Sequence, residues 1–296
     1  MSSQRNEGRA PHQPDGPGGA PDAAADSNAA RDRAAAAAAA GTDAAANGAD
    51  AAPPGARSRI GIIAGSGPEA GVDLWAKVLR ANRELFGARY RGDLDAPEVV
   101  VFSVPELGLS MELEQNDARV WACLADTATR LAAHVDYYGI ACNTLNHYAP
   151  QLKALGLPAR LVSVGEVVRD YVRERGLARV ALLGARPVMD LGPWSPYRQL
   201  VGEVAVEVPA DGEELHRIIY DVKARGGDAP DIVERFARLL ARLESELVLL
   251  ACTELPLIPL PPDAPRTVDV TELLAFALAR RALTPPAAQA PAERCE

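Results

Sequence analysis

The sequence predicts an α/β fold made of two similar three-layer α/β lobes, whose parallel sheets face each other across a central cleft. From residue 59 onward, short apolar runs of strand length alternate with stretches of helical periodicity, as in parallel sheets covered by helices. In addition, the apolar run 59–65, followed by Pro68, resembles the run 179–184, followed by Pro187. This likeness indicates an internal repeat.

The first lobe is predicted over residues 58–160, and the C-terminal helix 270–283 is expected to join it. Runs of aliphatic or aromatic residues predict its strands, and apolar residues recurring every three or four positions predict its helices. The elements expected in order are a strand over 60–64, a helix over 69–85, a strand over 98–104, a helix over 117–134, a strand over 137–141 and a helix ending at 155.

The second lobe is predicted over residues 161–269 by the same two patterns. The elements expected in order are a strand near 161–164, a helix over 166–175, a strand over 179–184, a proline-rich helical connection, a strand over 204–208, helices over 212–225 and 230–244, a strand over 247–251, a strand near 267–270 and a helix ending at 282.

The two ends of the chain differ from this body. Residues 1–57 are rich in Ala, Gly, Asp and Pro and contain no Val, Ile, Leu, Phe, Trp or Tyr. Such a segment buries too little apolar surface to offset the entropy of ordering, so we expect a disordered extension. Residues 284–296 are expected to form a disordered tail.

Composition excludes several classes of function. A net charge of −9 without a basic stripe argues against a nucleic-acid partner, and no apolar stretch has the length of a membrane-spanning helix. The four cysteines, at positions 123, 142, 252 and 295, form no CxxC pair and no metal-type spacing. The simplest expectation is a cytoplasmic protein with free thiols and no metal.

Two cysteines stand in matched contexts. Cys142 follows the predicted strand 137–141, Cys252 follows the predicted strand 247–251, and small polar residues come directly after each. Backbone amides where a strand passes into a helix favour a bound anion and also lower a thiol's pKa. We therefore predict that a carboxylate substrate presents its α-carbon between two sulfurs. The residues expected to hold the carboxylate are Asn143, Thr144 and Thr253.

Four motifs resemble the aspartate/glutamate racemase family. They are the glycine-rich run 61–70, Cys142-Asn143-Thr144, the segment 216–221 and Cys252-Thr253-Glu254, which occur in the family's order and span residues 59–283. The resemblance implies racemization without pyridoxal phosphate or any other cofactor: one cysteine thiolate removes the α-proton and the other thiol returns a proton to the opposite face. It also implies a small carboxylate substrate, aspartate or glutamate by type, and a homodimer as a possible assembly.

The recognition positions depart from this pattern. The family often has an arginine after the second strand, whereas 105–111 holds no cation. Arg186 is a candidate for the distal carboxylate and is equally well explained as a surface arginine. Gly65 is expected to let the backbone approach the substrate, and Ser66 to offer a hydroxyl. His216 either reaches the cleft or packs on its helix. Glu254 either caps the following helix, the simpler account, or orients Cys252.

Two further hypotheses stay open. A related two-cysteine enzyme could act on a hydantoin, on maleate or on an arylmalonate. Alternatively, the chain could bind a carboxylate without turning it over. The segment 193–196 is a candidate contact in a homodimer.

Overall fold

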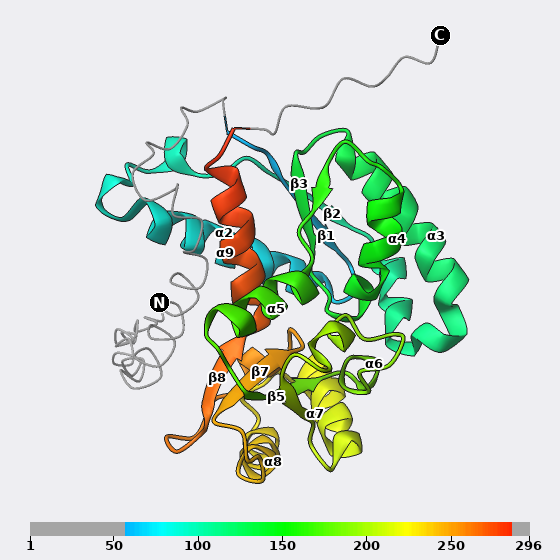
Figure 1. Cartoon of the computed structure of the whole chain (residues 1–296), viewed down its shortest axis with the longest axis vertical. Coiled ribbons are helices and arrows are strands. Elements are labelled where there is room, and N and C mark those ends of the chain that lie inside the picture. Colours follow the sequence, from blue (N-terminus) through cyan, green and yellow to red (C-terminus); the bar gives the residue numbers. More distant parts are fainter. Residues whose placement is uncertain (1–56, 286–296) are drawn as a thin grey trace, which may run out of the picture.

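The computed structural model describes residues 57–285 (Figure 1). The disordered segments predicted over 1–57 and 284–296 fall outside the described residues, apart from 57, 284 and 285. Both the backbone N–H and the hydroxyl of Ser58 donate to the carbonyl of Thr284, each at 2.9 Å. The two ends of the described chain therefore lie side by side.

Two four-stranded parallel sheets form the framework, as the sequence predicts. The first has the order β2-β1-β3-β4 and the second the order β6-β5-β7-β8. The strands are β1 (Ile60–Ala64), β2 (Val99–Ser103), β3 (Tyr137–Ile140), β4 (Arg160–Leu161), β5 (Arg179–Gly184), β6 (Ala205–Glu207), β7 (Leu247–Ala251) and β8 (Arg266–Asp269). Each half thus repeats one strand order, which matches the predicted similarity of the two lobes.

The sheets divide the chain slightly later than the sequence suggests. The strand expected near 161–164 was assigned to the second lobe, but β4 pairs in parallel with β3 of the first sheet. Its residues Arg160 and Leu161 align with Tyr137 and Tyr138. The first sheet therefore uses a fourth strand, and α5 (Val164–Glu174) follows it directly.

Helices cover both faces of each sheet. The remaining α-helices are α2 (Pro68–Phe86), α3 (Leu113–Ala132), α4 (Ala149–Ala154), α6 (Arg186–Met189), α7 (Gly212–Arg225), α8 (Pro230–Leu240) and α9 (Val270–Ala282). Three 3₁₀ segments border the cysteine motifs, namely η3 (Pro105–Glu112), η4 (Thr144–Tyr148) and η6 (Leu255–Leu257). The structure differs from prediction mainly at helix ends: α3 begins four residues early, and α8 ends at Leu240.

Alternating strand residues account for the three layers. In β1, Ile62 packs into a core that includes Leu74 of α2, whereas Ile63 packs into a core that includes Leu124 of α3. Side chains on a strand point alternately to opposite faces, so a strand that is apolar throughout must be covered on both sides. All five residues of β1 are buried, and so are all five of β7.

One hydrophobic core joins the lobes. It contains Ile62 of the first sheet, Leu182 and Leu249 of the second sheet, and Leu278 of α9. Figure 1 shows α9 beside α2 and the first sheet, with the second sheet below. A Cβ added to Gly139 of β3 would lie 2.9 Å from Leu278 Cδ1, so α9 packs closely on the first sheet. Within residues 57–285, no helix has the length and apolar character needed to cross a bilayer.

Candidate active site

Cys142 lies directly beyond the carboxyl end of β3 and is half-buried. Its Sγ is 3.9 Å from the hydroxyl of Ser110, which in turn lies 2.9 Å from the hydroxyl of Ser66. Ser110 is fully buried in η3 and Ser66 belongs to the glycine loop after β1. The first thiol therefore lies beside one hydroxyl, that of Ser110, which the glycine loop contacts through Ser66.

The glycine loop approaches η3 very closely. Gly65 has φ +116°, and a Cβ placed there would lie 2.1 Å from the carbonyl oxygen of Val104. Only glycine tolerates both this φ and this contact. Gly65 therefore sets the path of the loop against the neighbouring segment, and this path brings Ser66 to Ser110.

Cys252 lies beyond the carboxyl end of β7 beside a carboxylate. Its Sγ donates a 2.9 Å hydrogen bond to Oε2 of Glu254, and the hydroxyl of Thr253 donates to the same oxygen at 3.0 Å. The ammonium group of Lys223, on α7, pairs with the other oxygen, Oε1. One carboxylate thus connects the second thiol to a cation.

These contacts fix the charge states around the second thiol. Burial and then the Glu254 carboxylate raise the pKa of the Cys252 thiol well above its usual value. Burial alone would raise the pKa of Glu254, but Lys223 and the hydrogen bonds from Cys252 and Thr253 hold it below its usual range. Burial alone would lower the pKa of Lys223, but Glu254 raises it. Cys252 therefore rests as a protonated thiol between charged groups.

Residues of the two lobes meet at this place. The hydroxyl of Tyr197, from the segment after β5, donates a hydrogen bond to Oδ1 of Asn143. A Cβ added to Gly67 of the first lobe would lie 3.6 Å from Lys223 Nζ and 3.7 Å from Glu254 Oε1. The glycine loop therefore lies beside Glu254 of the second cysteine motif, and Asn143 of the first motif contacts the second lobe through Tyr197.

Both thiols influence the same two side chains. Burial raises the pKa of Tyr197 well above its usual value, and Asp269, Cys252 and Cys142 contribute to the same shift. Cys252 and Cys142 also contribute to the raised pKa of Lys223, after the opposing effect of burial and the effect of Glu254. Cys142 and Cys252 therefore both contribute to the raised pKa of Tyr197 and of Lys223.

The expected helix after Cys142 is present as α4, which a 3₁₀ segment precedes and which ends one residue earlier than expected. The helix expected after Cys252 is absent, because η6 is a single 3₁₀ turn. Glu254 stands at the N-cap position of η6 and makes no capping hydrogen bond with its side chain. Its carboxylate is instead used by Cys252, Thr253 and Lys223, so the orienting account of Glu254 describes its geometry.

Arg186 and His216 lie beside the lobe contact. Arg186 forms an ion pair with Glu213 at 2.8 Å, and 58% of its side chain is exposed. The ring of His216 packs edge-on against Tyr220 at 4.9 Å, and Tyr220 donates a 3.4 Å hydrogen bond to Glu112 of η3. Burial and then Arg186 lower the pKa of His216. The structure therefore brings His216 to Glu112 and Arg186.

Thr144 is buried at the start of η4. The residue two positions later, Asn146, occupies a structural position: its amide donates 2.9 Å to the Cys142 carbonyl and accepts 3.1 Å from the Val164 backbone. Asn146 therefore ties the cysteine turn to the start of α5.

The sequence does not indicate three of the residues that lie near the thiols, namely Ser110, Tyr197 and Lys223. A signal existed for Lys223, because His216, Tyr220 and Lys223 are spaced i, i+4, i+7 and so share a face of α7. Ser110 and Tyr197 come from irregular segments whose path no periodicity predicts.

The segment 193–196 makes a contact within the chain. The ring of Trp194 packs against His147 of the first lobe, with centroids 4.9 Å apart. Among residues 57–285, no group of three or more His, Cys, Asp or Glu side chains is placed to hold a metal ion.

Comparison with known proteins agrees with this arrangement. The family model for Asp/Glu/hydantoin racemases matches residues 63–278, which include both cysteine motifs and both sheets. The chain belongs to the Asp/Glu/hydantoin racemase family. This assignment makes it a member of a racemase family and confirms the resemblance found in the sequence.

Individual relatives are distant. The chain is 22% identical over 203 residues to a broad specificity amino-acid racemase of Bacillus subtilis (strain 168), covering 66% of this chain and 85% of that protein. An aspartate racemase homologue from Pyrococcus horikoshii OT3 is 26% identical with a TM-score of 0.61, covering 76% of this chain and 99% of that one. The Picrophilus torridus aspartate racemase is 24% identical with a TM-score of 0.63, covering 76% and 94%.

Proposed function

We propose that the protein is a cofactor-independent amino-acid racemase in which Cys142 and Cys252 work on opposite faces of one α-carbon. The observation that carries the proposal is the matched position of the two thiols: each follows the third strand of its half, and both influence Tyr197 and Lys223. A reversible inversion needs a base and an acid that exchange roles, and two like residues supply them.

The resting charge states suggest how a turnover begins. Cys252 is held as a thiol by Glu254, so we propose it as the proton donor and Cys142 as the base. Cys142 takes the α-proton and becomes a thiol while the carbanion forms. Cys252 then gives its proton to the other face and becomes a thiolate. Lys223 offsets the charge of that new thiolate and of Glu254.

The polar groups beside the thiols are the candidates to bind the substrate's α-carboxylate. Asn143 Oδ1 accepts from Tyr197, so its Nδ2 is the group left to donate to a substrate. With the hydroxyls of Ser66 and Thr144, it forms a donor set for the α-carboxylate, whereas the Thr253 hydroxyl already donates to Glu254. Such donors stabilise the negative charge that develops as the α-proton leaves.

We propose an acidic amino acid, aspartate or glutamate by type, as the substrate. A distal carboxylate needs a cation, and Lys223 and Arg186 are the two candidates. Both are paired, Lys223 with Glu254 and Arg186 with Glu213. Lys223 is only 29% exposed and both thiols contribute to its raised pKa, whereas the Arg186 side chain is 58% exposed. Lys223 is therefore the better candidate.

The mechanism needs free thiols, which fits a reducing cytoplasm. A homodimer remains our expectation for the assembly.

The test is inversion without added cofactor. Purified full-length protein, freed of pyridoxal phosphate and metal, is incubated with each enantiomer of a panel of amino acids, and chirality is followed by circular dichroism and chiral chromatography. We expect inversion of an acidic amino acid in both directions. Turnover of a hydantoin or of maleate instead would favour the related two-cysteine enzymes, and binding of acids with no α-proton exchange would favour a binding protein.

A further inference from the structure

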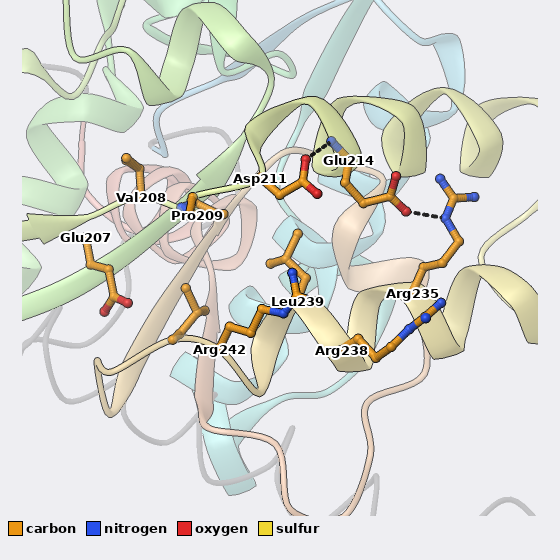
Figure 2. A pocket seen from close by; sticks show the side chains of 11 residues that line it. Glu207, Val208, Pro209, Asp211, Glu214, Arg235, Arg238, Leu239 and Arg242 are labelled. Carbon is orange, nitrogen blue, oxygen red and sulfur yellow. Dashed lines mark hydrogen bonds and ion pairs between the residues drawn. The ribbon is translucent and has the colours of Figure 1, made fainter.

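A pocket on the second lobe shares no lining residue with the cysteine site. It has a volume of about 300 Å³ and lies between the chain that follows β6 and helix α8 (Figure 2). The lining residues are Glu207, Val208, Pro209, Ala210, Asp211, Glu214, Arg235, Arg238, Leu239, Arg242 and Leu243. Neither the family motifs nor the proposed racemization uses this pocket.

The acidic side chains of the pocket already have donors. Glu207 accepts from the backbone N–H groups of Glu244 and Ser245, each at 2.8 Å, and from the Ser245 hydroxyl at 2.6 Å. Burial alone would raise the pKa of Glu207, but these hydrogen bonds hold it below its usual range. Asp211 accepts from the Glu214 N–H at 3.0 Å and so caps α7.

The third acid is paired with the first of three arginines. Glu214 accepts from Arg235 Nε at 2.5 Å and from Arg217 Nε at 3.0 Å. Arg235 also pairs with Asp221 at 2.6 Å. Figure 2 shows Glu214 and Arg235 joined across the pocket between α7 and α8. These charges balance one another within the protein.

Arg238 and Arg242 are different. Within residues 57–285, neither has an ion pair or a side-chain hydrogen bond, although both line the pocket. Arg238 lies on α8, and Arg242 lies in the turn that follows the end of the helix at Leu240. Both side chains are exposed, and both line the same pocket. A forked guanidinium group suits a carboxylate or phosphate anion.

The rest of the lining favours a small ligand. Val208 and Pro209 on one side and Leu239 and Leu243 on the other provide an apolar wall beside the two arginines. The net charge of the whole chain is −9, whereas this hollow is lined by two arginines that make no ion pair among residues 57–285. An anionic group that contacts both arginines would bind more tightly than one that contacts either arginine alone.

We propose that this pocket is a second ligand site, which binds a small multivalent anion of the carboxylate or phosphate class through Arg238 and Arg242. The ligand's charged end contacts the two guanidinium groups and its remainder lies against the apolar wall. The site is independent of the two cysteines.

Isothermal titration calorimetry on the full-length protein at constant ionic strength tests the proposal, with citrate and pyrophosphate as separate probes. At least one probe is expected to bind saturably with one site per chain, and Arg238→Gln/Arg242→Gln is expected to weaken it at least tenfold. A matched control, Arg119→Gln/Arg130→Gln, removes the same charge from α3 and should leave binding within twofold. The probe that binds identifies the carboxylate or the phosphate class.

Racemase rate and thermal midpoint of the pocket variant are measured alongside and should match the unaltered protein, which shows that the variant is folded. Absence of saturable binding of both probes to the unaltered protein would overturn the proposal. So would equal loss of binding in the pocket variant and in the control variant, because that result means a general effect of net charge.

Discussion

The thiol of Cys252 donates a 2.9 Å hydrogen bond to the carboxylate of Glu254, whereas the thiol of Cys142 lies 3.9 Å from the neutral hydroxyl of Ser110. The two strand ends are matched in topology, but their cysteines stand in different electrostatic surroundings. This asymmetry favours the protonated thiol at Cys252, and it has consequences that can be measured.

Glu254→Gln is expected to lower the pKa of the Cys252 thiol. A neighbouring carboxylate disfavours the thiolate, so its removal favours ionisation, and Lys223 then acts on the thiol without its partner. The measurement is the pH dependence of alkylation by iodoacetamide in a background where Cys123, Cys142 and Cys295 are replaced by serine. The midpoint should move to lower pH; an unchanged or higher midpoint would contradict the assigned contact.

Cys142→Ala and Cys252→Ala are each expected to lower the rate of racemization by about 10²–10⁴-fold or more, because each removes one of two acid–base groups. Each variant keeps one thiol and should still exchange the α-proton of one enantiomer with solvent. The enantiomer that exchanges should differ between the two variants, as followed by proton NMR in deuterium oxide. Exchange of the same enantiomer in both would place the two thiols on one face.

Tyr197→Phe tests the contact between the lobes. It removes the donor to Asn143 Oδ1 and leaves that oxygen buried without it, a change that costs about 1–3 kcal/mol in the free energy of unfolding. Because Asn143 is then less well held, KM for the substrate should increase. Urea unfolding and steady-state kinetics measure the two effects. A stable variant with unchanged KM would remove Tyr197 from the positioning of Asn143.

Lys223→Gln and Arg186→Gln separate the two candidates for the distal carboxylate. If Lys223 holds it, Lys223→Gln should raise KM for an acidic amino acid by roughly 10- to 100-fold, the range expected for a hydrogen bond to a charged group. Arg186→Gln, which breaks an exposed pair with Glu213, should change KM by less than about threefold. The reverse ranking would assign the distal carboxylate to Arg186.

The sequence predicted the framework well because the framework depends on periodicity. Strands such as β1 and β7 are buried on both faces and appear as unbroken apolar runs, and the repeat of strand and helix fixes a parallel sheet. β4 was placed in the wrong lobe because it has only two residues, too few to reveal which sheet it joins.

The site was predicted in part for the same reason. Cys142 and Cys252 were found because each ends a recognisable strand. Ser110 and Tyr197 were not, because their positions depend on how η3 and the segment after β5 fold onto the other elements. The sequence leaves two accounts of Glu254 open, and it does not favour the contact with Cys252 because the second partner of Glu254, Lys223, lies 31 residues away in the chain.

The most direct test of the central claim follows deuterium during early conversion. One enantiomer of the substrate is incubated with the protein in deuterium oxide, and the reaction is stopped before it approaches equilibrium. The two enantiomers are then separated, and the deuterium content of each is measured by mass spectrometry. Two thiols on opposite faces predict deuterium at the α-carbon of nearly all the product and of almost none of the recovered substrate. Equal labelling of product and recovered substrate from the first time points would show that one group handles both faces, and would contradict the account.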